Sequence, residues 1–272
     1  MLVALDGAWK LPCAYFLLDG LNGKDRANLV NECLRRLHAI GVQVTSITCD
    51  GPACNLYMFS ELGASTKPDN LKCWFPHPSD TNIKIYVLLD ACHMLKLMRN
   101  TLSTCVMKDK DGNEIKWVYI ERLHQLQQKE GLRAGNKVRA SHMQWTKQKM
   151  KVNLAAQVIS SSVADSLEFC LKLGLVEFAG CEPTIHFIRL IDHLFDILNS
   201  RNPIARNYKA SMRLSNRHIW QPFLTTAQQY ISTLTDSQGT AMTQTNRKTT
   251  FIGNNKSLFC FLSLISSISL LH

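Results

Sequence analysis

Two aspartates stand at the ends of segments that are typical of buried β-strands. Asp50 ends the β-branched segment 42–48, and Asp90 follows the apolar segment 83–89. In an α/β sheet, ligands and metals collect beyond the carboxyl ends of the strands, where a carboxylate can hold Mg²⁺. Two such ions about 4 Å apart can promote phosphodiester cleavage. For both aspartates a second interpretation stays open, namely that the side chain caps the helix that follows.

A basic segment between residues 133 and 151 contains no Asp or Glu. It supplies more than half of the formal net charge of +10, through Arg133, Lys137, Arg139, Lys147, Lys149 and Lys151. Such a segment predicts an anionic partner, either a nucleic-acid backbone, for which Arg139, Lys147 and Lys149 are candidates, or the phosphates of a nucleotide. A basic but inert surface is the alternative. No GxxxxGK[ST] motif occurs, so a P-loop is excluded.

A predicted helix that begins near His93 has a polar edge. Lys96, Arg99 and Asn100 are three to four residues apart, so they share one side of the helix. This edge faces either a phosphate backbone or solvent, and we take Lys96 and Arg99 as candidate DNA contacts. His93 lies near the candidate metal site at Asp90, although a histidine at a helix start is more often structural.

Cysteine usage and hydropathy limit the other classes of site. The ten cysteines are scattered, mostly in apolar runs, and form no CxxC pair, which favours free thiols over a structural zinc site. The apolar segment 257–271 is shorter than the roughly 20 residues that cross a bilayer, so we expect a buried or aberrant segment and no membrane partner.

The elements that position these residues alternate between strand and helix in the first part of the chain. Hydrophobic spacing predicts a hairpin over 2–6 and 12–18, a helix over 29–40, a strand over 42–48 and a helix over 53–62. Residues 64–82 are expected to be a loop and 83–89 a strand. The later chain is predicted to be helical from 117 to about 200, with helices over 154–173 and 184–198. Strand–helix alternation predicts an α/β layer, followed by a helical region.

Six segments, in order, resemble the P-element-type DNA transposases, a family that includes THAP-domain-containing relatives. They are ALDGAWKLPCAYFLLDGL (4–21), SITCDGPACNLYMFSELG (46–63), VLLDACHMLKLMRNTL (87–102), KMKVNLAAQVISSSVADSLEF (149–169), FIRLIDHLFDILNSRNP (187–203) and NRKTTFIG (246–253). The resemblance covers roughly residues 1–253. It implies an α/β RNase H-like fold with a DDE-type, two-metal active site, and a mainly α-helical GTP-binding insertion domain.

The resemblance also implies roles for particular residues. Asp50 matches a metal-binding carboxylate, and Asp90 and His93 match positions close to the catalytic centre. The segment FDILNS matches a guanine-recognition pattern, with Phe195, Asp196 and Asn199 at the base and Lys137 and Lys151 at the phosphates. The alternative for Phe195 is a place in the apolar core.

The resulting expectations concern domains and function. We expect a partial RNase H-like catalytic domain over 1–105, the GTP-binding insertion over 106–245, and a return to the core or an aberrant tail over 246–272. Two of the three catalytic carboxylates have no counterpart in the resemblance, so we predict a nuclear DNA-transposition fragment that is catalytically incomplete. Its ancestral cofactors are Mg²⁺ and GTP, its DNA partner is the transposon ends, and homo-oligomerisation is left open. The alternatives are a non-catalytic GTP- and nucleic-acid-binding regulator and a decayed copy without function.

Overall fold

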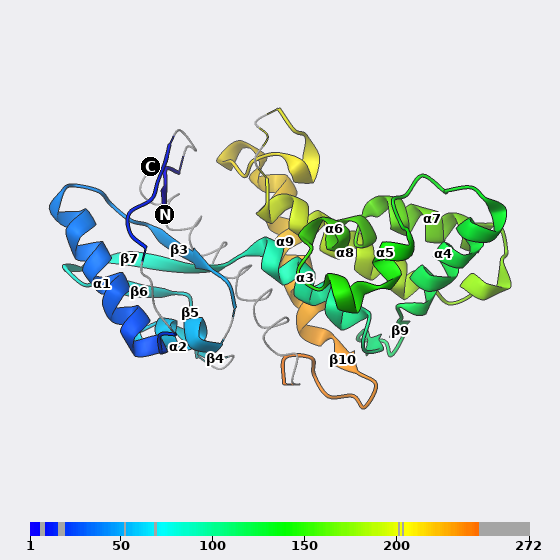
Figure 1. The fold of residues 1–272 in the computed structure, drawn as a ribbon, viewed down its shortest axis with the longest axis horizontal. Coiled ribbons are helices and arrows are strands. Elements are labelled where there is room, and N and C mark those ends of the chain that lie inside the picture. Colours follow the sequence, from blue (N-terminus) through cyan, green and yellow to red (C-terminus); the bar gives the residue numbers. More distant parts are fainter. Residues whose placement is uncertain are drawn as a thin grey trace. The chain divides into compact units, whose positions relative to one another are not determined.

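The computed structural model describes residues 1–5, 9–15, 20–51, 53–67, 70–200, 202 and 204–244, with residues 66, 67, 70 and 71 described by their backbone alone. The chain forms two compact units, residues 1–88 and residues 89–272 (Figure 1). The predicted tail over 257–271 lies outside the described residues. No helix in the described part of the chain has the length and apolar character that a bilayer span requires.

The first unit opens with the predicted hairpin, which is confirmed in a shorter form. Strand β1 (Leu2–Val3) pairs antiparallel with β2 (Lys10–Leu11). The second strand therefore lies earlier than the predicted 12–18. Proline has no N–H to donate to a ladder, so Pro12 explains why the pairing stops at Leu11.

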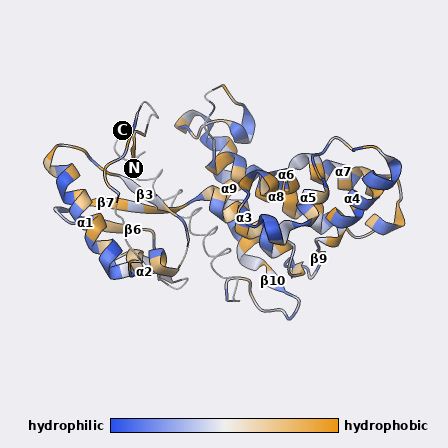
Figure 2. Ribbon diagram, viewed as in Figure 1, coloured by the Kyte–Doolittle hydropathy of each residue, from blue (hydrophilic) through white to orange (hydrophobic). Residues whose placement is uncertain are grey.

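A three-stranded sheet in the order β3-β7-β6 forms the centre of the first unit. Its strands are β3 (Ser46–Cys49), β6 (Trp74–His77) and β7 (Asp80–Leu89). The second half of the central strand β7 is apolar (Figure 2), and its residues 85–89 are buried, as expected for a strand covered on both faces.

The loop predicted over 64–82 is wrong. Strands β4 (Ser65–Lys67) and β5 (Asn70–Lys72) pair there as an antiparallel hairpin, and β6 pairs antiparallel with β7. The prolines of this segment made its sequence resemble a loop, so its strands were not predicted. Pro76 is accommodated because β6 is an edge strand, where a missing N–H costs little.

Two helices, α1 (Gly23–Ala39) and α2 (Ala53–Glu61), pack against each other in the first unit. Both were predicted, and each is followed by a glycine with a left-handed backbone, Gly41 at φ +79° and Gly63 at φ +97°. A Cβ atom at Gly23 would collide with the Tyr57 ring and a backbone carbonyl of α2, so only glycine permits this close packing.

The second unit is mainly helical, and its other elements pack around the long helix α8 (Glu182–Leu198). Neighbours of α8 are α3 (Ala91–Leu102), α7 (Ser161–Lys172) and α9 (Arg217–Thr233). As predicted, Ile185, Ile188 and Ile191 are buried. Its further helices are α4 (Val118–Glu130), α5 (Ala140–Met143) and α6 (Val152–Val158), and its short 3-10 turns are η1 (Trp145–Gln148), η2 (Val176–Phe178), η3 (Asn207–Lys209) and η4 (Leu214–Asn216).

A small antiparallel sheet in the order β10-β8-β9 completes the second unit. Strands β8 (Met107–Lys108) and β9 (Glu114–Ile115) pair antiparallel across a short turn. Strand β10 (Thr235–Asp236) pairs antiparallel with β8.

The single helix predicted over 154–173 is wrong, because α6 and α7 are separate helices. The break falls at Ile159 and Ser160, whose backbones leave the helical region. Asp192 of α8 stabilises the new helix start: its Oδ2 accepts hydrogen bonds from Ser161 N at 2.8 Å and Ser161 Oγ at 2.6 Å. A carboxylate at a helix N-terminus satisfies a backbone donor and opposes the positive end of the dipole.

Candidate functional site

Asp50 lies directly after β3, as predicted, and its side chain is exposed. The strand end is fixed by its own backbone: Asn55 Nδ2 donates to the Asp50 carbonyl at 3.0 Å. Arg26 Nη1 of α1 in turn donates to Asn55 Oδ1 at 2.9 Å. The buried Asn55 therefore joins the end of β3 to both helices of the first unit, and a well-anchored backbone presents the Asp50 carboxylate at the surface.

The neighbouring thiol of Cys49 is protonated. Burial, followed by the negative charge of Asp50, raises the pKa of Cys49 to about 12, so this thiol stays protonated at neutral pH. Within the described ranges, no group of three His, Cys, Asp or Glu side chains is arranged to hold a metal ion. Among the described residues, the Asp50 carboxylate alone does not fit a two-metal centre.

Asp90 and His93 lie in the second unit, at the start of α3. Asp90 is the N-cap residue, and its Oδ2 accepts a hydrogen bond from His93 N at 2.8 Å. The capping interpretation of Asp90 is therefore confirmed, and His93 is half-buried in the first turn. Their predicted closeness to a catalytic centre stays a prediction.

The segment FDILNS forms the last turn of α8 and the residues after it. Phe195 is half-buried and packs against the core, facing Ala91, Leu95 and Met98 of α3 in a narrow hollow. Asn199 is the C-cap residue, and its backbone N–H donates to the Phe195 carbonyl at 2.9 Å. The end of α8 and the start of α3 thus lie side by side, and Phe195 is left partly exposed.

Asp196 is a carboxylate in a mostly desolvated place. Its side chain is 20% exposed, and Lys209 Nζ of η3 lies 3.8 Å from its Oδ2. Burial raises the pKa of Asp196, and the nearby Asp192 raises it further, whereas Lys209 and His193 oppose the shift. A carboxylate that water solvates poorly gains more from accepting donors of a bound ligand.

The two lysines predicted to hold phosphates are both exposed, and both follow anchored segments. Lys137 stands beside the buried Asn136, whose Nδ2 donates to Ser166 Oγ of α7 at 2.9 Å. Lys151 is the N-cap residue of α6. Helix α3 packs against α6, the helix that follows Lys151, and against α8, the helix that carries the FDILNS segment.

The predicted DNA contacts differ in exposure. Arg139, Lys147 and Lys149 are exposed and Lys96 is half-buried, whereas Arg99 is completely buried. Arg99 Nη2 donates to the backbone carbonyls of Gln148 at 3.0 Å and Lys149 at 3.4 Å. A buried guanidinium cannot reach a phosphate backbone, so Arg99 was misassigned from its helical spacing. It holds the basic segment against α3 instead.

Lys209 and an aromatic cluster beside it were missed from the sequence. The ring of Tyr208 lies 4.5 Å from that of His193 and 4.7 Å from that of Phe223, so η3 is fixed between α8 and α9. This packing places Lys209 next to Asp196. The available signal was the absence of any acidic residue between positions 197 and 235, which indicates a second basic region.

Two family models match the chain. The model described as "TNP-like, RNase H N-terminal domain" matches residues 1–63, and "TNP-like, GTP-binding insertion domain" matches residues 92–211. The second match includes all five predicted nucleotide contacts.

Similar proteins agree with these matches. The human DNA transposase THAP9 is 32% identical over 253 residues, which are 93% of this chain and 28% of that protein. The Drosophila melanogaster transposable element P transposase is 32% identical over 198 residues, 72% of this chain and 25% of that protein. A solved structure, the Drosophila P element transposase strand transfer complex, matches with a TM-score of 0.76 and 26% identity, over 89% of this chain and 52% of that one.

This chain therefore spans between a quarter and a third of the length of its curated relatives. With its RNase H-type N-terminal segment and its GTP-binding insertion domain, it is a relative of the P-element-type DNA transposases.

Proposed function

We propose that this chain binds guanine nucleotide between the end of α8 and the basic segment 133–151. The observation that supports this proposal is the poorly solvated Asp196 carboxylate at the end of α8. Helix α8 lies within the residues that match the GTP-binding insertion domain. Asp196 accepts the two N–H groups that guanine presents on one edge, and adenine lacks this pair of donors. The base is thereby selected by hydrogen bonding.

Neighbouring residues complete the proposed contacts. The exposed part of Phe195 stacks on the base, and Asn199 hydrogen-bonds at its edge. Lys137 and Lys151 bind the phosphates as point charges, which does not require a P-loop. When GTP binds, the Asp196 carboxylate accepts hydrogen bonds from the base in place of part of its contact with Lys209. The charge of Lys209 stays near the nucleotide.

The proposed activity is DNA transposition, to which this chain contributes the nucleotide site and the DNA contacts. Arg139, Lys147, Lys149 and Lys96 contact the phosphate backbone of transposon ends, in the nucleus, and homo-oligomerisation brings two ends together. Asp50 supplies one Mg²⁺ ligand. We propose that this polypeptide does not catalyse strand transfer alone, because one carboxylate cannot hold two metal ions. A non-catalytic GTP- and DNA-binding regulator is the second candidate, favoured by a nucleotide site that does not depend on Asp50.

Nucleotide titrations of matched variants test the nucleotide site. A fluorescent GTP analogue is titrated into the purified chain and into Asp196→Ala and Lys137→Ala. Loss of one charge-assisted hydrogen bond costs about 1.5–3 kcal/mol, so Lys137→Ala is expected to bind roughly 10- to 150-fold more weakly. Asp196→Ala loses two such bonds and is expected to bind at least as weakly.

The controls remove similar charges elsewhere in the second unit. Asp165→Ala and Lys172→Ala change exposed side chains of α7 and are expected to leave affinity unchanged. Wild-type affinity in both Asp196→Ala and Lys137→Ala would refute the assignment of the site.

A further inference from the structure

A second basic surface lies on the segment that joins α8 to α9. Residues 197–235 contain five Lys or Arg residues and no Asp or Glu. Of these, Arg206 and Arg213 are exposed, and Arg217 is half-exposed in the first turn of α9. Lys209 forms an ion pair with Asp196. Arg206, Arg213 and Arg217 form no ion pair among the described residues. A surface of one sign favours a polyanion.

The turn that carries Arg213 is held rigidly by a buried tryptophan. Trp220 is 4% exposed, and its Nε1 donates to the Arg213 carbonyl at 3.2 Å and to Asn216 Oδ1 at 2.9 Å. Asn216 Oδ1 also accepts from the Arg213 backbone N–H at 2.8 Å, and its Nδ2 donates to the Ser211 carbonyl at 3.0 Å. Four hydrogen bonds thus fix the backbone, and the Arg213 side chain is left outside.

The turn that carries Arg206 is fixed in a different way. The stacking of Tyr208 on Phe223 holds η3 against α9. Asn207, directly after Arg206, is the one non-glycine residue of the described chain with a positive φ, at 54°. A left-handed asparagine is uncommon and permits a sharp change of direction. The chain therefore turns outward at Arg206 while Tyr208 points inward.

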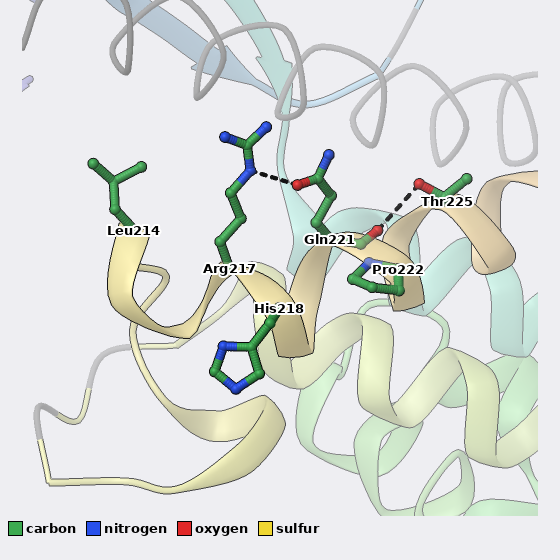
Figure 3. Close-up of a pocket in the computed structure, with 6 residues that line it drawn as sticks. All are labelled: Leu214, Arg217, His218, Gln221, Pro222 and Thr225. Carbon is green, nitrogen blue, oxygen red and sulfur yellow. Dashed lines mark hydrogen bonds between the residues drawn. The ribbon is translucent and has the colours of Figure 1, made fainter.

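Beside Arg217, an open groove runs along α9 (Figure 3). Arg217, Gln221 and Thr225 are spaced four residues apart, so they follow one edge of the helix. Arg217 Nε donates to Gln221 Oε1, which orients the guanidinium and leaves its two terminal nitrogens available for further acceptors. His218 also lines the groove. The edge offers donors and contains no carboxylate.

We propose that Arg206, Arg213 and Arg217 form a surface that binds the phosphate backbone of duplex DNA. The occupant is a phosphate backbone because the surface is exposed, open and cationic, and because its rigid presentation lowers the ordering entropy that binding requires. Base edges are not read here, so binding is independent of sequence. The surface extends the proposed DNA binding to a region outside residues 133–151, and it does not include the residues of the nucleotide site.

The salt dependence of DNA binding tests this surface. Fluorescence anisotropy is measured with two labelled duplexes of unrelated sequence between low and moderate salt, for the whole chain and for the triple variant Arg206→Gln/Arg213→Gln/Arg217→Gln. Each lost phosphate contact reduces the slope of log K against log salt by about 0.9. We expect the variant's slope to be shallower by roughly 2 to 3, equally for both duplexes.

A matched triple variant removes three exposed lysines elsewhere in the second unit, Lys110→Gln/Lys129→Gln/Lys172→Gln. The proposal is supported when only the arginine variant loses slope. It is overturned by an unchanged slope in that variant, by an equal loss in the lysine variant, or by a wild-type chain that does not bind duplex DNA.

GTP titration of the same arginine variant keeps the two proposals separate. Wild-type nucleotide affinity is expected there, because the variant leaves Phe195, Asp196 and Asn199 intact. This titration also shows that the second unit is folded, so a lost salt slope can be assigned to the surface itself.

Discussion

Removal of the Asp192 carboxylate is expected to destabilise the second unit, because this side chain caps α7 from α8. Its Oδ2 accepts two hydrogen bonds from Ser161, at 2.8 Å from the backbone N and 2.6 Å from Oγ. Hydrogen bonds to a charged group contribute about 1.5–3 kcal/mol each, and loss of an N-cap alone costs about 0.5–2 kcal/mol. The contributions overlap, so Asp192→Ala should lower the free energy of unfolding by about 2–4 kcal/mol.

Urea denaturation, followed by the far-ultraviolet circular dichroism of the helices, measures this loss. Asp192→Asn keeps one acceptor oxygen and is expected to lose about half as much stability. The control is Asp165→Ala, which breaks an exposed ion pair with Arg189 and should cost no more than about 1 kcal/mol. Equal stability losses in Asp192→Ala and Asp165→Ala would refute the account of how α7 begins.

The remaining predictions concern the two other aspartates. Asp50→Asn should change no nuclease activity of this chain, since a single carboxylate cannot hold two metal ions; Mg²⁺-dependent cleavage that vanishes in the variant would contradict this. Asp196→Asn should stabilise the fold near neutral pH. Burial, followed by the nearby Asp192, raises the pKa of the Asp196 carboxyl above its ordinary value of 3.8. The stability that the protonated carboxyl contributes to the fold is therefore fully present below the unfolded-state pKa, and it is lost as the pH rises through the folded-state pKa. The stability gain of the variant over wild type should therefore grow between about pH 4 and 7, and a gain that shrinks over that interval in thermal melts would show the shift to be misassigned.

The sequence predicts most of the elements, because the spacing of hydrophobic residues is a strong local signal. Helices α1, α2 and α8 were predicted from this spacing, and Gly41 and Gly63 follow α1 and α2 with left-handed backbones. The break between α6 and α7 depends on Asp192, which is 31 residues from its partner Ser161 in the chain. A contact between residues so far apart in the chain does not change the local spacing of apolar residues, so that spacing did not predict the break.

Residue type and position select the candidate site residues, whereas tertiary packing decides whether each one is exposed. The roles of Asp196 and Asn199 follow from the family resemblance and stay predictions, and the structure adds the ion pair between Asp196 and Lys209. Arg99 shares a helical edge with polar neighbours, so spacing placed it outside, whereas its guanidinium supports the backbone of the segment 148–149. Helical periodicity gives the direction of a side chain relative to its own helix, and only the tertiary fold shows what covers it.

We expect Asp196 to recognise the paired N–H donors of guanine, and competition between nucleotides measures this recognition. A fluorescent GTP analogue bound to the wild-type chain is displaced by GTP, by inosine triphosphate, which lacks the exocyclic amine, and by ATP. One lost charge-assisted hydrogen bond corresponds to roughly a 10- to 150-fold loss of affinity. The expected order of affinity is GTP, then inosine triphosphate weaker by such a factor, then ATP. Equal displacement by ATP and GTP would contradict it.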